Sequence, residues 1–227
     1  MAKQVKGNAR TSLEGINDSL SSIEQRVEKN KKYIYYVLGA IAAIVAIVLI
    51  YIYAIRNPGI EDAKKQISQA DMVLFEQNNP DSALVLYERV FNNSSYKPAN
   101  RAGQMAGILL YQKGKYDEAI KYLEKTSADG KIAGPAVKSL LGDCYVNKKN
   151  YDKALTAYDE AIKLAGDNAN YTPLFMIKKA TVQHALKKYD GELETYESLK
   201  SKFPQYAISS NTNIDKYIER AKALAGK

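Results

Sequence analysis

The sequence predicts an all-α protein: an N-terminal transmembrane helix, then an α-solenoid of about four helical hairpins, then a C-terminal capping helix. Three observations predict this layout: an uncharged run at residues 33–55, a pattern that recurs four times between residues 79 and 192, and an apolar stripe after residue 209. We therefore expect an arm at 1–32, a span at 33–55, a linker at 56–60, repeats at 61–208 and a cap at 209–227.

The arm carries a short heptad pattern. Leu13, Ile16, Leu20, Ile23 and Val27 are spaced alternately three and four residues apart, which is typical of a coiled-coil seam. The pattern is too short for a coiled coil that is stable by itself. The seam could pair with a second copy or a membrane partner, and a helix lying on the inner membrane surface is the open alternative.

The span has the length and composition of a membrane helix. Its 23 residues contain no charge, and as a helix they reach roughly 34 Å, close to a hydrocarbon core of about 30 Å. Tyrosines lie near both ends, at 33, 35 and 36 and at 51 and 53, where the lipid headgroups favour them. A buried helix of a soluble protein is the alternative, but such a helix rarely runs this long without a polar face.

The charges that flank the span predict its orientation. Arg26, Lys29, Lys31 and Lys32 precede it, whereas Arg56 alone follows it closely. The positive-inside rule then places the arm in the cytoplasm and exports the C-terminal part. The apolar run is too long and too far from the start for a cleaved signal peptide, so we expect an uncleaved anchor.

The charge of the C-terminal part excludes one class of function. Residues 57–227 hold 25 basic and 21 acidic residues in mixed-sign stretches, within a chain of net charge +8. Such a surface lacks the basic stripe that binds phosphates, so we expect no nucleic-acid partner. Cys144 is the single cysteine, and an intramolecular disulfide is therefore impossible.

After a turn signal at Asn57-Pro58-Gly59, the chain repeats itself. An acid followed closely by a small residue or Glu recurs at intervals of 36, 35 and 38 residues, and a large side chain follows four residues later. Periods of this size indicate stacked helical units. The four segments are 79–83, 114–119, 149–154 and 187–192.

These segments resemble the tetratricopeptide repeat, a helix-turn-helix unit of about 34 residues. The third copy carries the resemblance most fully, with Leu141, Gly142, Tyr145, Tyr151, Ala154, Tyr158 and Ala161. In the fourth, Glu192 replaces the small alanine of the helix contact, and its first helix could be one residue out of register. The resemblance covers about 61–205 and implies paired helices that stack.

Two features complete the predicted stack. Asp81, Asp117, Asp152 and Asp190 fall at the start of each second helix, where an acid favours the helix dipole. An apolar stripe follows a helix start at 209–213, and it is typical of the cap that a solenoid needs. Two longer joints, 92–100 and 127–135, are expected to be loops.

The sequence offers little material for catalysis. His184 is the only histidine, so a histidine-based metal cluster cannot form, and a groove-lining or half-buried ring is expected instead. For Cys144, between Gly142 and Tyr145, we expect a buried structural thiol. The sequence has no glycine-rich phosphate loop, so we expect no enzyme, no cofactor and no metal.

The resemblance implies a groove that binds a peptide or a helix of a partner. Lysine and asparagine, which grip a terminal carboxylate in chaperone-binding relatives, are absent from the corresponding positions. Ordinary solvated helix surface is the alternative for each groove residue. Carried onto this chain, the groove consists of Lys65, Ser68, Met72, Phe75, Arg101, Gln104, Ile108, Tyr111, Ser139, Asp143 and Asn147.

The whole layout resembles the YfgM-type ancillary proteins of bacterial envelopes. That resemblance implies a single-pass inner-membrane protein with periplasmic repeats, acting beside the Sec translocon with translocon subunits, periplasmic chaperones or exported chains. A second hypothesis is an architectural subunit that assembles a larger inner-membrane complex through the arm and the span. A third is a receptor with cytosolic repeats, which the basic N-terminal flank disfavours.

Overall fold

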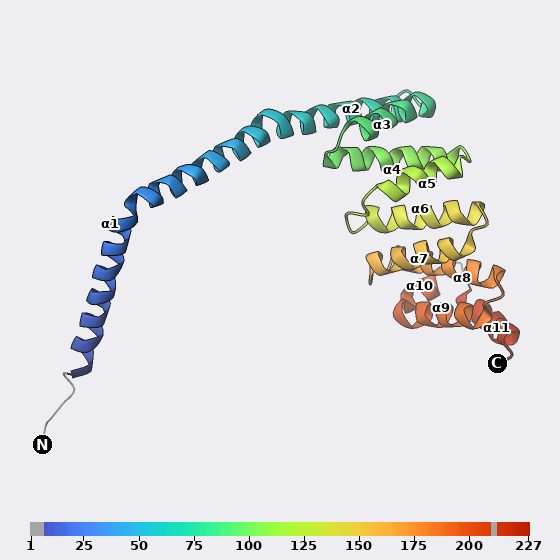
Figure 1. Ribbon diagram of the computed structural model, residues 1–227. Coiled ribbons are helices and arrows are strands. Elements are labelled where there is room, and N and C mark those ends of the chain that lie inside the picture. The colour runs from blue at the N-terminus through green and yellow to red at the C-terminus, as the bar shows by residue number, and fades with distance from the viewer. Residues whose placement is uncertain (1–6, 210–212) are drawn as a thin grey trace, which may run out of the picture. The chain divides into compact units, whose positions relative to one another are not determined.

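The computed structural model describes residues 7–209 and 213–227, with side chains from residue 26 onward except at 207 and 209. The chain divides into two compact units, Met1–Pro58 and Gly59–Lys227, and each is described by itself. Figure 1 shows that the described residues are almost entirely helical.

The first unit is a long helix. α1 spans Gly7–Ile50, and a six-residue π-helix, η1, follows at Tyr51–Arg56. The helical stretch Arg26–Phe75 contains an 18-residue segment with a mean hydropathy of 2.7, and no residue of that segment is buried. This helix is long and apolar enough to cross a membrane. Of the arm residues with the heptad pattern, Val27 is exposed, and the side chains of the other four lie outside the described part.

The turn that we expected at Asn57-Pro58-Gly59 is not formed, because α2 begins at Asn57. The wider π-helical turn just before it suits a proline, whose ring would clash with a carbonyl of a regular helix. Proline and glycine therefore lie inside a continuous helical stretch here and not in a loop.

The second unit consists of four helical hairpins and two terminal helices. From α3 to α9 each helix packs against the next one in the chain, and α11 packs against α9 (Figure 1). The short helix α10 was not expected, and the loops at 92–100 and 127–135 are shorter than predicted. The pairs are α2 (Asn57–Phe75) with α3 (Pro80–Asn93), α4 (Lys97–Gln112) with α5 (Tyr116–Lys125), α6 (Ala133–Asn147) with α7 (Tyr151–Ala165), and α8 (Thr172–Ala185) with α9 (Tyr189–Lys202), followed by α10 (Pro204–Ser209) and α11 (Ile214–Ala225).

Side-chain caps start several of these helices. Asn79, Asn150 and Asn213 each accept a hydrogen bond from the backbone N–H three residues later, at distances of 3.0, 3.4 and 3.0 Å. Such a cap satisfies one of the free donors at a helix start. Asn213 lies in the segment where the cap was expected to begin, and α11 follows it directly.

The first helix of a hairpin ends in a recurring turn. In the second, third and fourth hairpins a backbone N–H reaches the carbonyl five residues earlier: Lys115 to Leu110, Asn150 to Tyr145 and Lys188 to Gln183, each at 2.9 Å. α11 closes in the same way, from Lys227 to Lys222 at 3.0 Å. α11 therefore ends as the first helix of a hairpin ends.

The buried apolar side chains form two clusters. The larger runs from Ala63 on α2 to Tyr158 on α7 and adds Val182 of α8. The smaller joins α8, α9 and α11 and includes Met176, Leu199 and Ile218. Small residues allow paired helices to pack closely. At Gly142, for example, an added Cβ would lie 2.5 Å from the ring of Tyr158, which is too close for a side chain.

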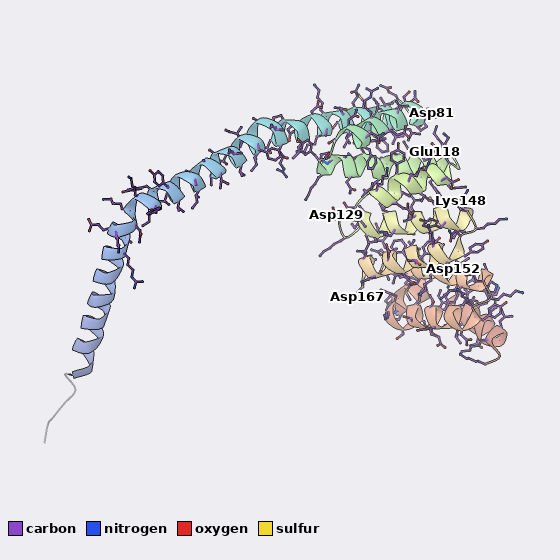
Figure 2. The ribbon with its side chains drawn as sticks, viewed as in Figure 1. Asp81, Glu118, Asp129, Lys148, Asp152 and Asp167 are labelled. Carbon is purple, nitrogen blue, oxygen red and sulfur yellow. The ribbon has the colours of Figure 1, made fainter. Side chains whose placement is uncertain are left out.

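An ion-pair ladder follows one edge of the hairpin stack. Each aspartate at the start of a second helix pairs with a lysine from the turn of the next unit, and Figure 2 shows Asp81, Lys148 and Asp152 along this edge. The last rung comes from the lysine that follows α11. The rungs are Asp81–Lys113, Asp117–Lys148 at 2.8 Å, Asp152–Lys188 at 3.5 Å and Asp190–Lys227 at 2.6 Å.

Candidate functional site

The candidate site is the face that α2, α4, α6 and α8 share, here called the first-helix face. Residues of different hairpins are equivalent when they lie the same number of residues before the recurring turn that leads into the second helix. On this basis Asp143 of α6 corresponds to Ile108 of α4 and to Thr181 of α8, so the fourth hairpin is in register.

The first hairpin departs from that register by one residue. The N–H of Asn79 reaches the carbonyl of Val73, six residues back and not five, so its turn holds one additional residue. The counterpart of Asp143 is therefore Asp71 and not Met72, and the predicted positions on α2 are shifted by one. Met72 and Phe75 are nevertheless exposed, as are Lys65 and Ser68.

Asp71 is held from two sides. The hydroxyl of Tyr87 on α3 donates to Oδ1 at 2.5 Å, and the guanidinium of Arg101 on α4 lies 2.8 Å from Oδ2. Burial, followed by the neighbouring carboxylate, raises the pKa of Tyr87 far above its ordinary value of 10. The hydroxyl therefore keeps its proton and remains a donor to Asp71.

The same arrangement recurs at Asp143. Tyr158 of α7 donates to Oδ1 at 2.7 Å, and the ammonium of Lys178 on α8 lies 2.6 Å from Oδ2. The same ammonium is 3.2 Å from the hydroxyl of Ser139, which is buried. Each of these two carboxylates is thus fixed by a tyrosine of its own hairpin and neutralised by a cation on the first helix of the next hairpin.

An apolar window lies between these two polar groups, and it consists of Ile108 and Tyr111 on α4. The second hairpin has Leu123 where its neighbours have Tyr87 and Tyr158, so Ile108 faces no hydroxyl. Both window side chains are partly exposed, and the Tyr111 ring packs 5.6 Å from that of Tyr116. Burial, together with nearby Asp143, raises the pKa of Tyr111.

Three other predicted residues already use their polar groups in contacts within the chain. Gln104 donates to the carbonyl of Ser127 at 3.1 Å, so its amide is already engaged. Asn147 is exposed, and its amide donates to the carbonyl of Asp143 at 2.9 Å. Arg101 is about half exposed beside its contact with Asp71. The structure thus brings Arg101, Ile108, Tyr111 and Asp143 to one face.

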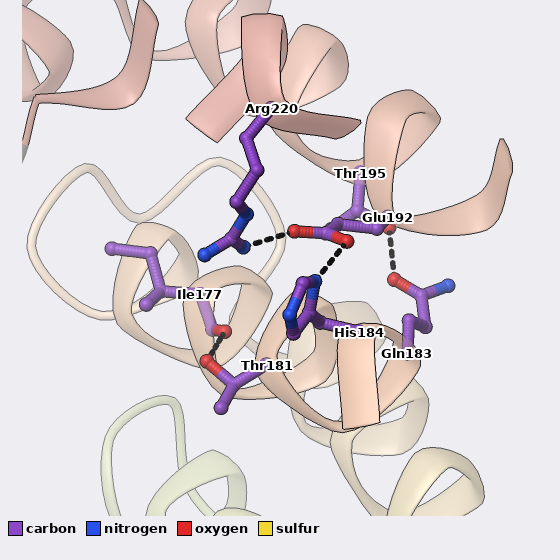
Figure 3. Close-up of polar contacts among 7 residues, drawn as sticks. All are labelled: Ile177, Thr181, Gln183, His184, Glu192, Thr195 and Arg220. Carbon is purple, nitrogen blue, oxygen red and sulfur yellow. Dashed lines mark hydrogen bonds and ion pairs between the residues drawn. The ribbon is translucent and has the colours of Figure 1, made fainter. Parts of the chain in front are cut away.

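At the end of the stack, Glu192 forms a buried ionic cluster that sequence reasoning marked only as a departure from alanine. Its carboxylate is fully buried, with one oxygen 2.8 Å from Nδ1 of His184 and the other paired with Arg220 of α11 (Figure 3). Beside it Thr195 donates to Gln183 at 2.9 Å. The signal in the sequence was a charge in a small-residue position.

The described residues hold no group of three His, Cys, Asp or Glu side chains that could bind a metal. Cys144 is fully buried, and burial raises its pKa to about 12. A thiol with that pKa stays protonated at neutral pH, and only the thiolate is a nucleophile. The first-helix face offers recognition chemistry: an apolar window between fixed charges.

Comparison with known proteins supports the hairpin stack as a tetratricopeptide-like fold. The family model described as tetratricopeptide repeat matches residues 105–169. A search of curated proteins finds no match.

Solved structures with the same fold share little sequence with this chain. The crystal structure of MamA superposes with a TM-score of 0.57 at 20% identity, covering 73% of this chain and 84% of that one. That of BtubC (BKLC) from P. vanneervenii gives 0.55 at 17% identity, covering 80% and 79%. At these identities the likeness concerns the fold.

Proposed function

We propose that this chain, a tetratricopeptide-like stack of hairpins preceded by a helix that can span a membrane, is an anchored module that binds segments of other proteins. The observation that carries the proposal is the apolar window of Ile108 and Tyr111 between the fixed carboxylates Asp71 and Asp143. An apolar anchor in a rigid polar frame is what a binding hot spot requires.

The finer proposal is a periplasmic co-chaperone or scaffold near the secretion machinery, with translocon subunits, chaperones or exported chains as partners. Its support is the cationic flank before the span, which favours export of the C-terminal unit. The layout adds the resemblance to YfgM-type proteins.

An architectural subunit is the second candidate. It is favoured by α1, whose helix covers both the arm and most of the apolar run and exposes Val27 together with the apolar residues that follow. In this case the arm and the span would assemble the complex, and the hairpins would only pack.

Photo-crosslinking in intact cells separates the two. One photo-reactive residue replaces Tyr111 on the first-helix face, and a second replaces Leu20 in the arm. A third replaces Val85 on α3, an exposed position away from that face, as the matched control. The trapped chains are then identified.

Capture of translocon subunits, chaperones or several exported proteins at Tyr111, with none at Val85, is the expected result. One stoichiometric membrane partner at Leu20 with an empty Tyr111 position would instead make the chain a structural subunit. Equal capture at Tyr111 and Val85 would remove the first-helix face as a binding site.

A further inference from the structure

We propose that the pocket beside the N-terminal end of α4 binds an acidic segment of a protein partner. The proposal rests on the proposed function and names the chemistry of the ligand. The pocket has a volume of about 600 Å³ and lies between the loop after α3 and the loop after α5. Its lining joins the first-helix face at Arg101 and Gln104.

One wall of the pocket is fixed to α4 by side-chain amides. The Nδ2 of Asn100 donates to the carbonyl of Ser127 at 3.0 Å, while the N–H of Ser127 donates to Oδ1 of Asn100 at 2.6 Å. Gln104 adds a second donor to the same carbonyl. The loop after α5 is therefore held in place without a ligand.

The opposite wall is fixed by close packing. Within the second unit, the ring of Tyr96 lies so near Gly59 that a Cβ there would be 2.4 Å from it. Phe91, which also lines the pocket, packs edge-on against Tyr122 with ring centroids 5.2 Å apart. Both walls are thus built before binding, which lowers the entropic cost of binding.

The charges in the pocket are unbalanced. Lys97, Arg101 and Lys125 line it; Arg101 is already paired with Asp71, and the one acid of the lining, Asp129, already accepts a hydrogen bond from the hydroxyl of Ser127 at 2.7 Å. Of the described residues, none forms an ion pair with Lys97 or Lys125. Figure 2 places Asp129 on the edge of the stack opposite Asp81 and Asp152 of the ladder. Each ladder aspartate is paired with a lysine, whereas Lys97 and Lys125 have no acidic partner among the described residues.

The size and chemistry of the pocket favour a peptide. Its volume falls within the usual range of about 300–1,000 Å³ for ligand sites. Three cations are fewer than the four to eight or so that mark lipid-binding clusters. A peptide that places its acid between Lys97 and Lys125 can continue past Gln104 toward the window at Ile108 and Tyr111.

Fluorescence anisotropy on the full chain in nanodiscs of zwitterionic lipid tests this. The probes are a short labelled peptide with a Leu-Phe pair beside a run of glutamates, and its counterpart with glutamines. The variant is K97Q/K125Q, and the matched control is K163Q/K202Q, which removes two exposed lysines from a different pocket between α7 and α9. The variant Ile108→Asn tests the apolar window separately.

We expect the glutamate peptide to bind tighter than the glutamine peptide, and K97Q/K125Q to weaken it about tenfold, because each lost charge pair contributes on the order of a few-fold. The control should bind both peptides as the parent does. Equal binding of the two peptides, or unchanged binding by K97Q/K125Q, would overturn the acidic-segment proposal.

The remaining measurements show whether the pocket or the first-helix face fails as a binding site. If Ile108→Asn weakens both peptides while K97Q/K125Q has no effect, the first-helix face stands and the acidic pocket falls. If K97Q/K125Q alone matters, the pocket stands and the window does not. Nanodiscs with anionic lipid form a separate arm, and loss of lipid contact in K97Q/K125Q without loss of peptide binding would assign the pocket to lipid.

Discussion

Three tyrosine hydroxyls on separate helices each donate to a carboxylate. Tyr87 and Tyr158 bind Asp71 and Asp143 of the first-helix face, and Tyr145 binds Glu124 of α5. Burial is the largest cause that raises the pKa of all three hydroxyls, and the neighbouring carboxylates raise it further. Each hydroxyl is therefore a donor that must keep its proton.

These pairs predict that the fold is sensitive to alkali. Below pH 10, the ordinary tyrosine value, folded and unfolded chains both hold the protons, and the stabilisation is complete. Above it the unfolded chain loses protons first, so the free energy of unfolding falls as pH rises. Tyr158→Phe should cost about 1.5–3 kcal/mol at neutral pH, since it removes a hydrogen bond to a charged group. It should also flatten the alkaline fall, as urea denaturation at neutral and alkaline pH would measure.

Tyr189→Phe is the matched control, because this tyrosine is only partly buried and its ring packs near His184. An alkaline fall of the same slope in Tyr158→Phe as in the parent would contradict the assignment.

At the scale of elements, two kinds of interaction join neighbouring hairpins: apolar packing and ion pairs. The apolar faces bury small residues against large ones, and the ladder adds one exposed ion pair per joint. An exposed pair contributes only about 0–1 kcal/mol, so the ladder sets alignment more than stability. α11 uses the same rung through Lys227, but it adds a pair whose carboxylate is fully buried, that of Glu192 with Arg220.

This buried pair predicts an asymmetric response to mutation. Arg220→Ala leaves the fully buried Glu192 with His184 alone, and should lower the free energy of unfolding by about 3–5 kcal/mol. The double variant E192A/R220A should be more stable than Arg220→Ala, because it restores the alanine found at 119 and 154. Urea denaturation with hydrogen exchange of α11 measures both.

Lys200→Ala provides the comparison, since its pair with Asp215 also joins α9 to α11 but is exposed. It should cost under about 1 kcal/mol. If the double variant were no more stable than Arg220→Ala, the burial of Glu192 would not be the cause.

At the scale of the second unit, the apolar core is divided. The larger cluster spans α2 to α7 and reaches Val182 of α8, and the smaller joins α8, α9 and α11. The joint between α6 and α8 carries the polar group of Ser139, Asp143 and Lys178. In a stack where each unit contacts only its neighbours, stability is roughly a sum of unit and interface contributions, so a joint with fewer apolar contacts couples its two sides less strongly.

Leu199→Ala should therefore lower protection from hydrogen exchange in α8 to α11 far more than in α4 to α7. Leu110→Ala, equally buried in the larger cluster, should do the reverse. Each substitution should cost about 2–5 kcal/mol. Loss of protection that spreads evenly over both clusters would show a single cooperative core.

Most of the architecture could be predicted from the sequence because the repeat pattern is periodic. The aspartates at helix starts, the glycine at 142 and the alanines at 119 and 154 follow from close packing and the helix dipole. Side-chain partners across hairpins could not be predicted, since Arg101, Lys178 and Arg220 occupy different turns of their helices. Nor could the register of α2, because one additional residue in the turn before Pro80 leaves the pattern of the flanking helices intact.

That additional residue determines which side of the whole helix α2 faces α3. Successive side chains of a helix are rotated by about 100°, so one residue more or less between α2 and α3 changes which side chain meets Tyr87. With the turn as it stands, Asp71 faces the tyrosine and Met72 faces solvent. An insertion of a single residue can thus exchange a charged binding surface for an apolar one without altering any residue of the helix that displays it.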